Sequence, residues 1–258
     1  MKRVLCIHGI GGKDATVDQW SGVWKNAFRN LSGPGPDLKF HFLKIDDLFI
    51  ESKDRMGGIK YFEAIRQFIS GWLNTITEEK FAGVEFLDSI RWVAGMPAQF
   101  ATDEILRKNL QKRLEKSICD FRPDLVYAHS LGSLILYDLL CQKSASDQYP
   151  ELMALTSGSQ IAHPAIRQLF GDAILPLKVK CWINLHNEND RVFASRPVPL
   201  KSGNFLQVET PFLYGMLHHE ALQYLDHQNT VTQAWPYART KYAPHWINPS
   251  VILRCTNE

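Results

Sequence analysis

The stretch Leu125-Val126-Tyr127-Ala128-His129-Ser130-Leu131-Gly132 decides the fold class of this chain. Its first three residues form a short apolar run after the breaker Pro123, which predicts a buried strand. Apolar residues then recur at helical spacing from Leu131 to Leu140, which predicts a helix. A strand that turns at once into a helix, with a serine at the turn and small residues two positions to either side, is typical of a nucleophile elbow. Ser130 is therefore the first candidate nucleophile.

A second signal lies at the N-terminus. Arg3 to Ile7 has the pattern of a buried parallel strand and runs directly into His8-Gly9-Ile10-Gly11-Gly12. Two phosphate-binding alternatives for this glycine-rich loop fail on spacing. A P-loop needs a glycine where Ile7 stands and Ser or Thr where Asp14 stands, and a dinucleotide fingerprint needs its third small residue at Asp14.

With both motifs in place, the chain resembles the α/β-hydrolase superfamily, in particular its small lipases and serine esterases. The resemblance follows the motif order over nearly the whole chain and is specific at the H-G loop and the elbow. It implies an α/β-hydrolase fold with a mostly parallel sheet of about six strands flanked by helices. No strand pair precedes the H-G loop, so the fold is expected to be trimmed at its N-terminus. The resemblance also implies that the backbone N–H groups of Ile10 and Leu131 form an oxyanion hole.

Alternating strand and helix patterns predict a single domain over residues 1–258. A clear helix is expected over Asp103–Phe121, with Thr102 placed to cap it. A second helix is expected over Gln19–Leu31. The expected strands besides the two above are Leu38–Ile45, Leu152–Thr156, Val179–His186 and Phe205–Glu209.

The segment from about residue 49 to 101 does not fit this alternation. It carries two helical patterns, one from Phe62 to Ile76 and one from Phe81 to Val93, with further aromatic residues outside both apolar stripes. The resemblance implies a helical cap over the active site, and a larger ordinary core is the alternative. Membrane contact through these helices is not predicted, because Lys and Arg do not line one face.

A serine hydroxyl is a weak nucleophile at neutral pH and needs a base, which in turn needs an acid to orient it. The resemblance implies that the acid follows the nucleophile in the chain and that the histidine comes last. The expected strand Val179–His186 ends in the polar turn Asn187-Glu188-Asn189-Asp190. We assign Asp190 as the acid, with Glu188 as the alternative.

The base is sought among the histidines of the last loop-and-helix region. The string His219-Glu220-Ala221-Leu222-Gln223-Tyr224-Leu225 resembles the family segment in which the catalytic histidine opens the final helix. We assign His219, with His218 as the alternative one residue away and His227 as the third candidate. A metal site built from these three histidines lacks supporting cysteine or carboxylate spacing, so no metal is predicted.

These residues predict a serine hydrolase that cleaves a carboxylic ester through an acyl-enzyme, with Ser130, His219 and Asp190 as its triad. Because the catalytic histidine must be neutral to act as a base, activity should fall as the pH drops through its pKa, which is ~6.5 for an unperturbed imidazole. A thioesterase, amidase or acyltransferase would use the same residues. A non-catalytic binding protein of the same fold is the alternative from another class.

Composition bounds the partners and the compartment. The 29 basic and 27 acidic residues give a net charge of +2, and no basic run interleaved with aromatics suggests a nucleic-acid groove. The five cysteines are scattered, which predicts reduced thiols and a cytoplasmic protein. No cofactor motif is present in the sequence. The expected partner is a small-molecule ester or lipid substrate, and the oligomeric state stays open.

Overall fold

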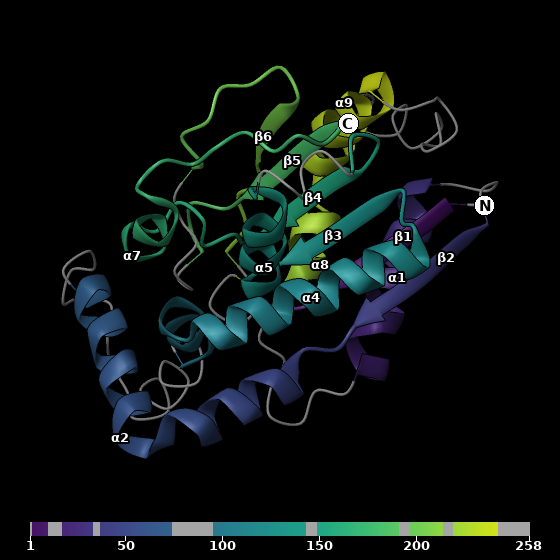
Figure 1. Cartoon of the computed structure of the whole chain (residues 1–258). Helices are drawn as coiled ribbons and strands as arrows, with labels where there is room; N and C mark the ends of the chain where they lie inside the picture. Colours follow the sequence, from purple (N-terminus) through teal and green to yellow (C-terminus); the bar gives the residue numbers. More distant parts are fainter. Residues whose placement is uncertain are drawn as a thin grey trace.

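A computed structural model places a parallel sheet between two layers of helices (Figure 1). It describes residues 2–9, 17–32, 37–73, 95–142, 149–190, 197–213 and 219–241. Six strands lie in the order β2-β1-β3-β4-β5-β6, and each neighbouring pair is parallel. The predicted α/β architecture, with about six strands flanked by helices, is confirmed.

The strands agree with the predicted ones to within two residues at either end. The second strand ends two residues early, shortly before a helix at Asp46, and the fifth begins two residues late, at Cys181. Leu152 N–H bonds to Tyr149 O in a turn, so the fourth strand begins one residue later. The strands are β1 (Lys2–Ile7), β2 (Leu38–Leu43), β3 (Leu125–His129), β4 (Met153–Ser157), β5 (Cys181–His186) and β6 (Phe205–Glu209).

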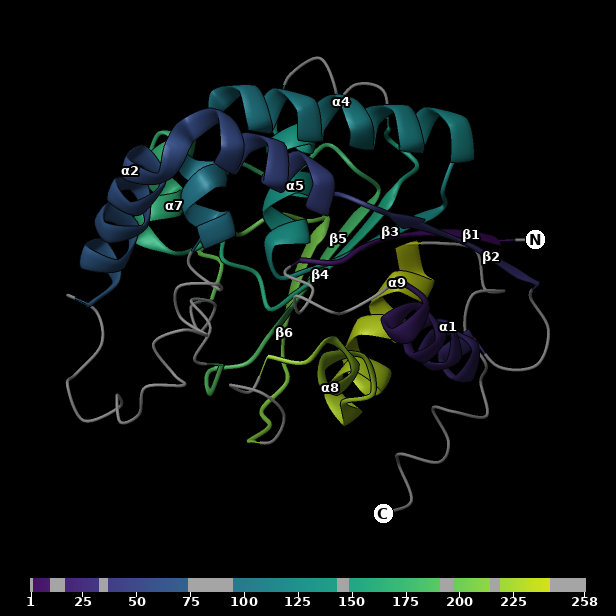
Figure 2. The same cartoon turned by 90° about the horizontal axis from the view of Figure 1, so that it is seen from below.

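The helices divide between the two faces of the sheet, as Figure 2 shows. One face carries α2 (Asp46–Leu73), α4 (Glu104–Phe121), α5 (Leu131–Leu140) and the short α7 (Pro164–Arg167). The other face carries α1 (Val17–Ser32), α8 (Ala221–Leu225) and α9 (Trp235–Lys241). None of the described helices is long and apolar enough to cross a bilayer.

Period-two alternation along the strands separates the two cores. On β3, Val126 and Ala128 belong to the core under α4 and α5, whereas Leu125 and Tyr127 belong to the core under α1 and α8. His129 has the parity of Tyr127, so its side chain lies on the α1 and α8 face. The position of a residue within its strand therefore decides which helices it can contact.

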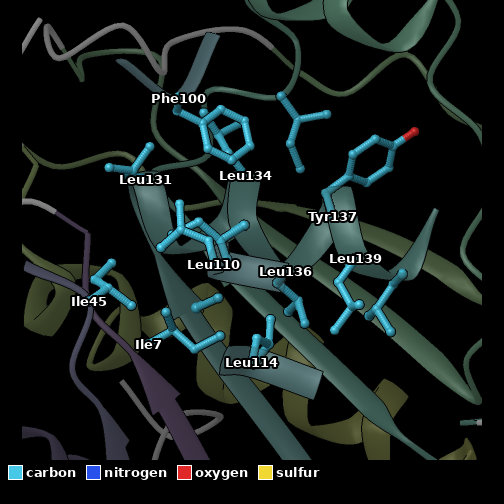
Figure 3. Close-up of a cluster of buried hydrophobic side chains, with 14 of the residues drawn as sticks. Ile7, Ile45, Phe100, Leu110, Leu114, Leu131, Leu134, Leu136, Tyr137 and Leu139 are labelled. Carbon is cyan, nitrogen blue, oxygen red and sulfur yellow. The ribbon is translucent and has the colours of Figure 1, made fainter. Parts of the chain in front are cut away.

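The core under α4 and α5 is mainly aliphatic (Figure 3). Leu110 and Leu114 of α4 are fully buried against a sheet that contributes Ile7. Burying one leucine side chain stabilises the fold by about 1.5–3 kcal/mol. This layer holds α4 and α5 in place, and α5 begins at the candidate nucleophile.

The N-terminus of α4 corrects one prediction. Asp103, not Thr102, is the N-cap: its carboxylate accepts from the N–H groups of Ile105 and Leu106 at 3.0 and 3.1 Å. Thr102 still belongs to the preceding helical segment, where its hydroxyl donates to Ala98 O at 2.7 Å. Asp103 is the residue with extended backbone angles, which the N-cap position requires.

The predicted cap segment is only partly described. Its first helical pattern falls on α2, which bends at Gly57 (φ 71°) and leaves Phe62 exposed after the bend. Both views place the second half of α2 toward the carboxyl ends of the strands (Figures 1 and 2). The second pattern, from Phe81 to Val93, lies outside the described residues, so the cap stays a prediction.

Candidate active site

Ser130 stands between β3 and α5 in a strained backbone conformation. Its angles, φ 56° and ψ −128°, are rare for a residue with a side chain. The turn is held from both sides, because Ser130 N–H donates to Ser157 O at 2.9 Å and Ser130 O accepts from Ser133 N at 2.9 Å. This is the tight strand-to-helix turn that the sequence predicts.

Glycines surround this turn because neighbouring chain comes too close for a Cβ atom. At Gly132 a Cβ would lie 2.6 Å from Ile7 O, which gives the physical reason for the small residue expected there. At Gly9 it would lie 2.6 Å from Ser130 Cβ and 2.7 Å from Leu131 N. Gly9, two residues after β1, therefore packs directly onto the elbow.

The elbow also lies where the strand order reverses. From β1 the chain passes through α1 to β2 on one side, whereas from β3 it passes through α5 to β4 on the other. The helices on the two sides, α1 and α5, cover opposite faces of the sheet. Open parallel sheets bind their ligands at such a switch point.

Three predicted residues from separate segments meet at Ser130. The His219 Nε2 atom lies 2.7 Å from Ser130 Oγ, and His219 Nδ1 lies 2.6 Å from Asp190 Oδ2. The carboxylate of Asp190 is fully buried, while 12% of the histidine side chain is exposed. A hydroxyl, an imidazole and a carboxylate thus form one hydrogen-bonded line that ends at the serine hydroxyl.

The alternative acid and the third histidine lie elsewhere. Glu188 is exposed in the turn that leads to Asp190, and His227 Nε2 bonds to Pro211 O at 3.1 Å. The alternative base His218 lies outside the described residues, as does Ile10 of the predicted oxyanion hole.

The other predicted oxyanion donor, Leu131, is the first residue of α5. Its N–H has no partner within the helix, because the first turn of a helix leaves its donors unpaired.

The structure corrects the expectation that the candidate base His219 opens the final helix. The helix α8 begins two residues after His219, at Ala221, and α9 follows α8, so α8 is not the final helix.

The turn that carries Asp190 is fixed by its own hydrogen bonds. Asp190 N–H donates to Asn187 O at 3.1 Å, and the Asn187 side chain donates to Phe212 O at 3.1 Å. The Tyr224 hydroxyl, from α8, donates to Asp190 Oδ2 at 2.6 Å. The carboxylate oxygen that faces His219 therefore accepts from two side chains.

A second buried group lies against the ring of His219. The ring of His129 has its centroid 4.8 Å from that of His219, at an interplanar angle of 40°. His129 Nδ1 bonds to Ser157 Oγ at 2.9 Å, and Ser157 Oγ bonds to the Tyr127 hydroxyl at 2.8 Å. Through the contact between the two rings, this chain leads from β3 and β4 to the candidate base.

The neighbouring imidazoles are held neutral. Burial, and then the nearby His219, lower the pKa of His129 well below its ordinary value. Burial lowers the pKa of His8 to about 4, and its ring stacks on Trp24 at 5.4 Å. An imidazolium can therefore form at His219 without a second positive charge beside it.

Sequence reasoning missed the roles of Tyr224 and His129. A signal was available for each. The helical spacing after His219 allows a buried Tyr224, and a buried tyrosine hydroxyl needs a partner. The alternation along β3 gives His129 the same face as Tyr127. Which partner each side chain meets depends on packing between segments that are far apart in the chain.

The donor set gives no separate indication of a metal. Among the described residues, no group of three or more histidine, cysteine, aspartate or glutamate side chains is arranged to hold a metal ion. The four cysteines among the described residues are free thiols and form no disulfide.

Comparison with known proteins adds little to this geometry. No family model matches the chain, and no curated protein does. Among solved structures the chain is similar to one described as "RedJ with PEG molecule bound in the active site". The two are 14% identical, the alignment covers 93% of this chain and 88% of the other, and the TM-score is 0.43. Function must therefore be argued from the site itself.

Proposed function

We propose that the protein is a serine hydrolase that cleaves a carboxylic ester through an acyl-enzyme. The observation that carries the proposal is the hydrogen-bonded line from Ser130 Oγ through His219 to Asp190 Oδ2, with distances of 2.7 and 2.6 Å. The strained elbow supports it, since a serine with φ 56° has no structural need for that conformation at an ordinary strand end.

In the proposed reaction, Ser130 Oγ attacks the acyl carbonyl carbon and passes its proton to His219 Nε2. The tetrahedral intermediate then expels the alcohol, which takes this proton from the imidazolium. Water attacks the acyl-enzyme next and gives its proton to the same nitrogen, which releases the carboxylic acid and restores Ser130. Asp190 stays ionised, orients the ring and stabilises the imidazolium.

The negative charge of the intermediate needs donors beside Ser130. We assign this role to the backbone N–H groups of Leu131 and Ile10. Gly9 supports the assignment, because it packs against Leu131 N and Ile10 is the next residue along the chain. Losing one such donor costs about 100- to 1000-fold in rate in other enzymes.

A fluorophosphonate probe tests the proposal directly, because it phosphonylates only an activated serine. The intact protein should gain one adduct, which peptide mass spectrometry should place on Ser130, and Ser130→Ala should gain none. Ser133→Ala is the matched control: this neighbouring hydroxyl is fully buried and bonds to Ser130 O rather than to His219, so labelling should persist. An intact protein that does not label would overturn the proposal.

The class of leaving group is tested with substrates that share one acyl chain and differ in whether it is bound to an alcohol, a thiol or an amine. The proposal expects p-nitrophenyl esters to be hydrolysed faster than the matching thioesters and anilides. A series of ester chain lengths should then show a preferred length, if the helical cap that we propose over the site bounds the acyl pocket. A preference for the thioester or the anilide would keep the triad and change the substrate class.

A further inference from the structure

Asp190 Oδ2 accepts two hydrogen bonds of equal length. One comes from His219 Nδ1 and one from the Tyr224 hydroxyl, both at 2.6 Å. The side chain of Asp190 is fully buried, as is Tyr224. In such surroundings a hydrogen bond to a carboxylate is stronger than it is in water.

The tyrosine hydroxyl is held in one place by its surroundings. Its ring packs edge-on against Phe212, with centroids 4.9 Å apart and an interplanar angle of 87°. Its backbone carbonyl accepts from Thr230 Oγ1 at 2.6 Å, which ties α8 to the turn that follows it. Burial, and then the charge of Asp190, raise the pKa of Tyr224 well above its ordinary value, so the phenol stays a donor.

We propose that Tyr224 is a positioning residue that holds Asp190 toward His219 and, by sharing the charge of Oδ2, sets the pH at which His219 becomes an effective base. This inference rests on the proposed function. It goes beyond it by assigning to a residue outside the triad the control of the working pH.

The sign of the effect follows from the shared oxygen. A donor to a carboxylate draws negative charge toward itself and makes that oxygen less basic. Without the phenol, Asp190 stabilises the imidazolium more strongly, so His219 keeps its proton to higher pH. The acid limb of the activity profile therefore moves upward when the hydroxyl is removed.

Other ionisable groups face this site from several elements and must be the same in the compared proteins. His129 and His8 act on His219 from the ends of β3 and β1. Tyr127 acts on Tyr224 from β3. The charge of Asp190 also acts on the pKa of His186, and the other charged groups that act on these side chains among the described residues include Glu188, Glu209 and Asp226. Removing a single hydroxyl leaves all of them in place.

Tyr224→Phe is the direct variant, measured as the rate of fluorophosphonate labelling and as kcat/KM on a p-nitrophenyl ester between pH 5 and 9. We expect the midpoint of the acid limb to move up by about half to one pH unit, which is about a 3- to 10-fold change in the protonation equilibrium. Tyr137→Phe is the matched control, because this buried tyrosine on α5 bonds to the backbone of Leu175 instead. Its midpoint should stay that of the unchanged protein.

Replacing Tyr224 with 3-fluorotyrosine tests the same bond while keeping the hydroxyl. A more acidic phenol donates more strongly, so the acid limb should move to lower pH. Two opposite shifts from the two variants cannot come from a general loss of packing. This second variant also keeps the test open if Tyr224→Phe folds poorly.

Nitrogen NMR of the His219 ring against pH reads the same equilibrium without turnover. We expect the protonation midpoint of the ring to rise in Tyr224→Phe and to fall with 3-fluorotyrosine. Unchanged midpoints in both variants, or shifts of the opposite sign, would overturn the role of Tyr224. If the NMR shifts appear but the intact protein does not label, the proposed function fails while the influence of the tyrosine stands.

Discussion

The two faces of the sheet are packed with different kinds of side chain. Under α4 and α5 the core is largely leucine and isoleucine. Under α1 and α8 it is rich in aromatic rings, among them Trp24, Tyr127 and Tyr224. The candidate base His219 and its buried partners lie on the second face. The face that is rich in aromatic residues, the aromatic face, therefore also surrounds the candidate base.

The difference has a physical reason. An aliphatic side chain contributes burial and nothing else, whereas tyrosine and histidine fill a core and still present a polar atom. Tyr127, Ser157 and His129 form a hydrogen-bonded chain inside the second core and end at His219. We therefore expect substitutions on the first face to change stability and substitutions on the second to change activity.

The largest expected effect is on the aromatic face. Asp190→Asn should lower kcat by about 10³- to 10⁴-fold, because an amide no longer fixes the tautomer and orientation of the histidine. The readout is the rate at which the fluorophosphonate probe phosphonylates Ser130, which depends on the same activation of the serine and not on product release.

Asp138→Asn on α5 is the matched control. This carboxylate is also buried, but it accepts from Gln111 at 2.7 Å on the other face of the sheet. Its rate of phosphonylation by the probe should stay within a few fold of that of the unchanged protein. Equal losses in the two variants would contradict the division between the faces.

The next effect is on stability alone. Leu114→Ala on α4 deletes a fully buried side chain from the aliphatic core and should lower the free energy of unfolding by about 2–5 kcal/mol. Urea unfolding measures this, and kcat per folded molecule should not change. Ile105→Ala on the same helix is the control, because Ile105 is 54% exposed and its loss should cost about 0.5 kcal/mol or less.

The third effect concerns Gly158, which lies against the candidate base His219. A Cβ at Gly158 would lie 2.7 Å from His219 Cε1, and the residue has φ +53°. Gly158→Ala should displace the ring and lower kcat/KM by about 100-fold. Gly171→Ala separates strain from contact: Gly171 has φ +69° but nothing within 4 Å of its would-be Cβ, so that variant should lose stability and keep its activity. If both variants lost activity alike, the contact with His219 would not matter.

The sequence predicts most of the strands and the elbow because these depend on local patterns. Ser130, Asp190 and His219 were chosen by motif order, and the structure brings their side chains together. What local patterns could not supply is the set of partners: Asp103 rather than Thr102 at the cap of α4, and Tyr224 on Asp190. The cap is a local feature that depends on which residue takes extended backbone angles, and the sequence pattern left two neighbouring residues able to do so. The bond of Tyr224 to Asp190 depends on how two distant segments pack, and one sequence carries no direct signal of that.

The last effect concerns how the free energy of unfolding depends on pH, which should respond to His129 on one face of the sheet and not to Leu114 on the other. Burial lowers the pKa of His8, His129 and His186, whereas the unfolded chain binds these protons below about 6.5. Between pH 6.5 and 5 the unfolded state therefore holds more protons than the folded state, and the free energy of unfolding falls as the pH falls. A histidine that stays neutral throughout contributes a loss of about 2 kcal/mol between pH 7 and 5.

His129→Gln should remove that contribution, so the difference in urea stability between pH 7 and 5 should shrink by about 2 kcal/mol. Leu114→Ala should leave the difference unchanged while lowering stability at both pH values, because no titrating group is lost. Among the described residues the pKa is lowered at three carboxylates, Asp47, Asp103 and Glu104, and these lose their stabilisation only below about pH 4.5, outside this window. If the stability of His129→Gln depended on pH as much as that of the unchanged protein, His129 would be protonated in the folded protein. The inference that a neutral imidazole lies beside His219 would then be wrong.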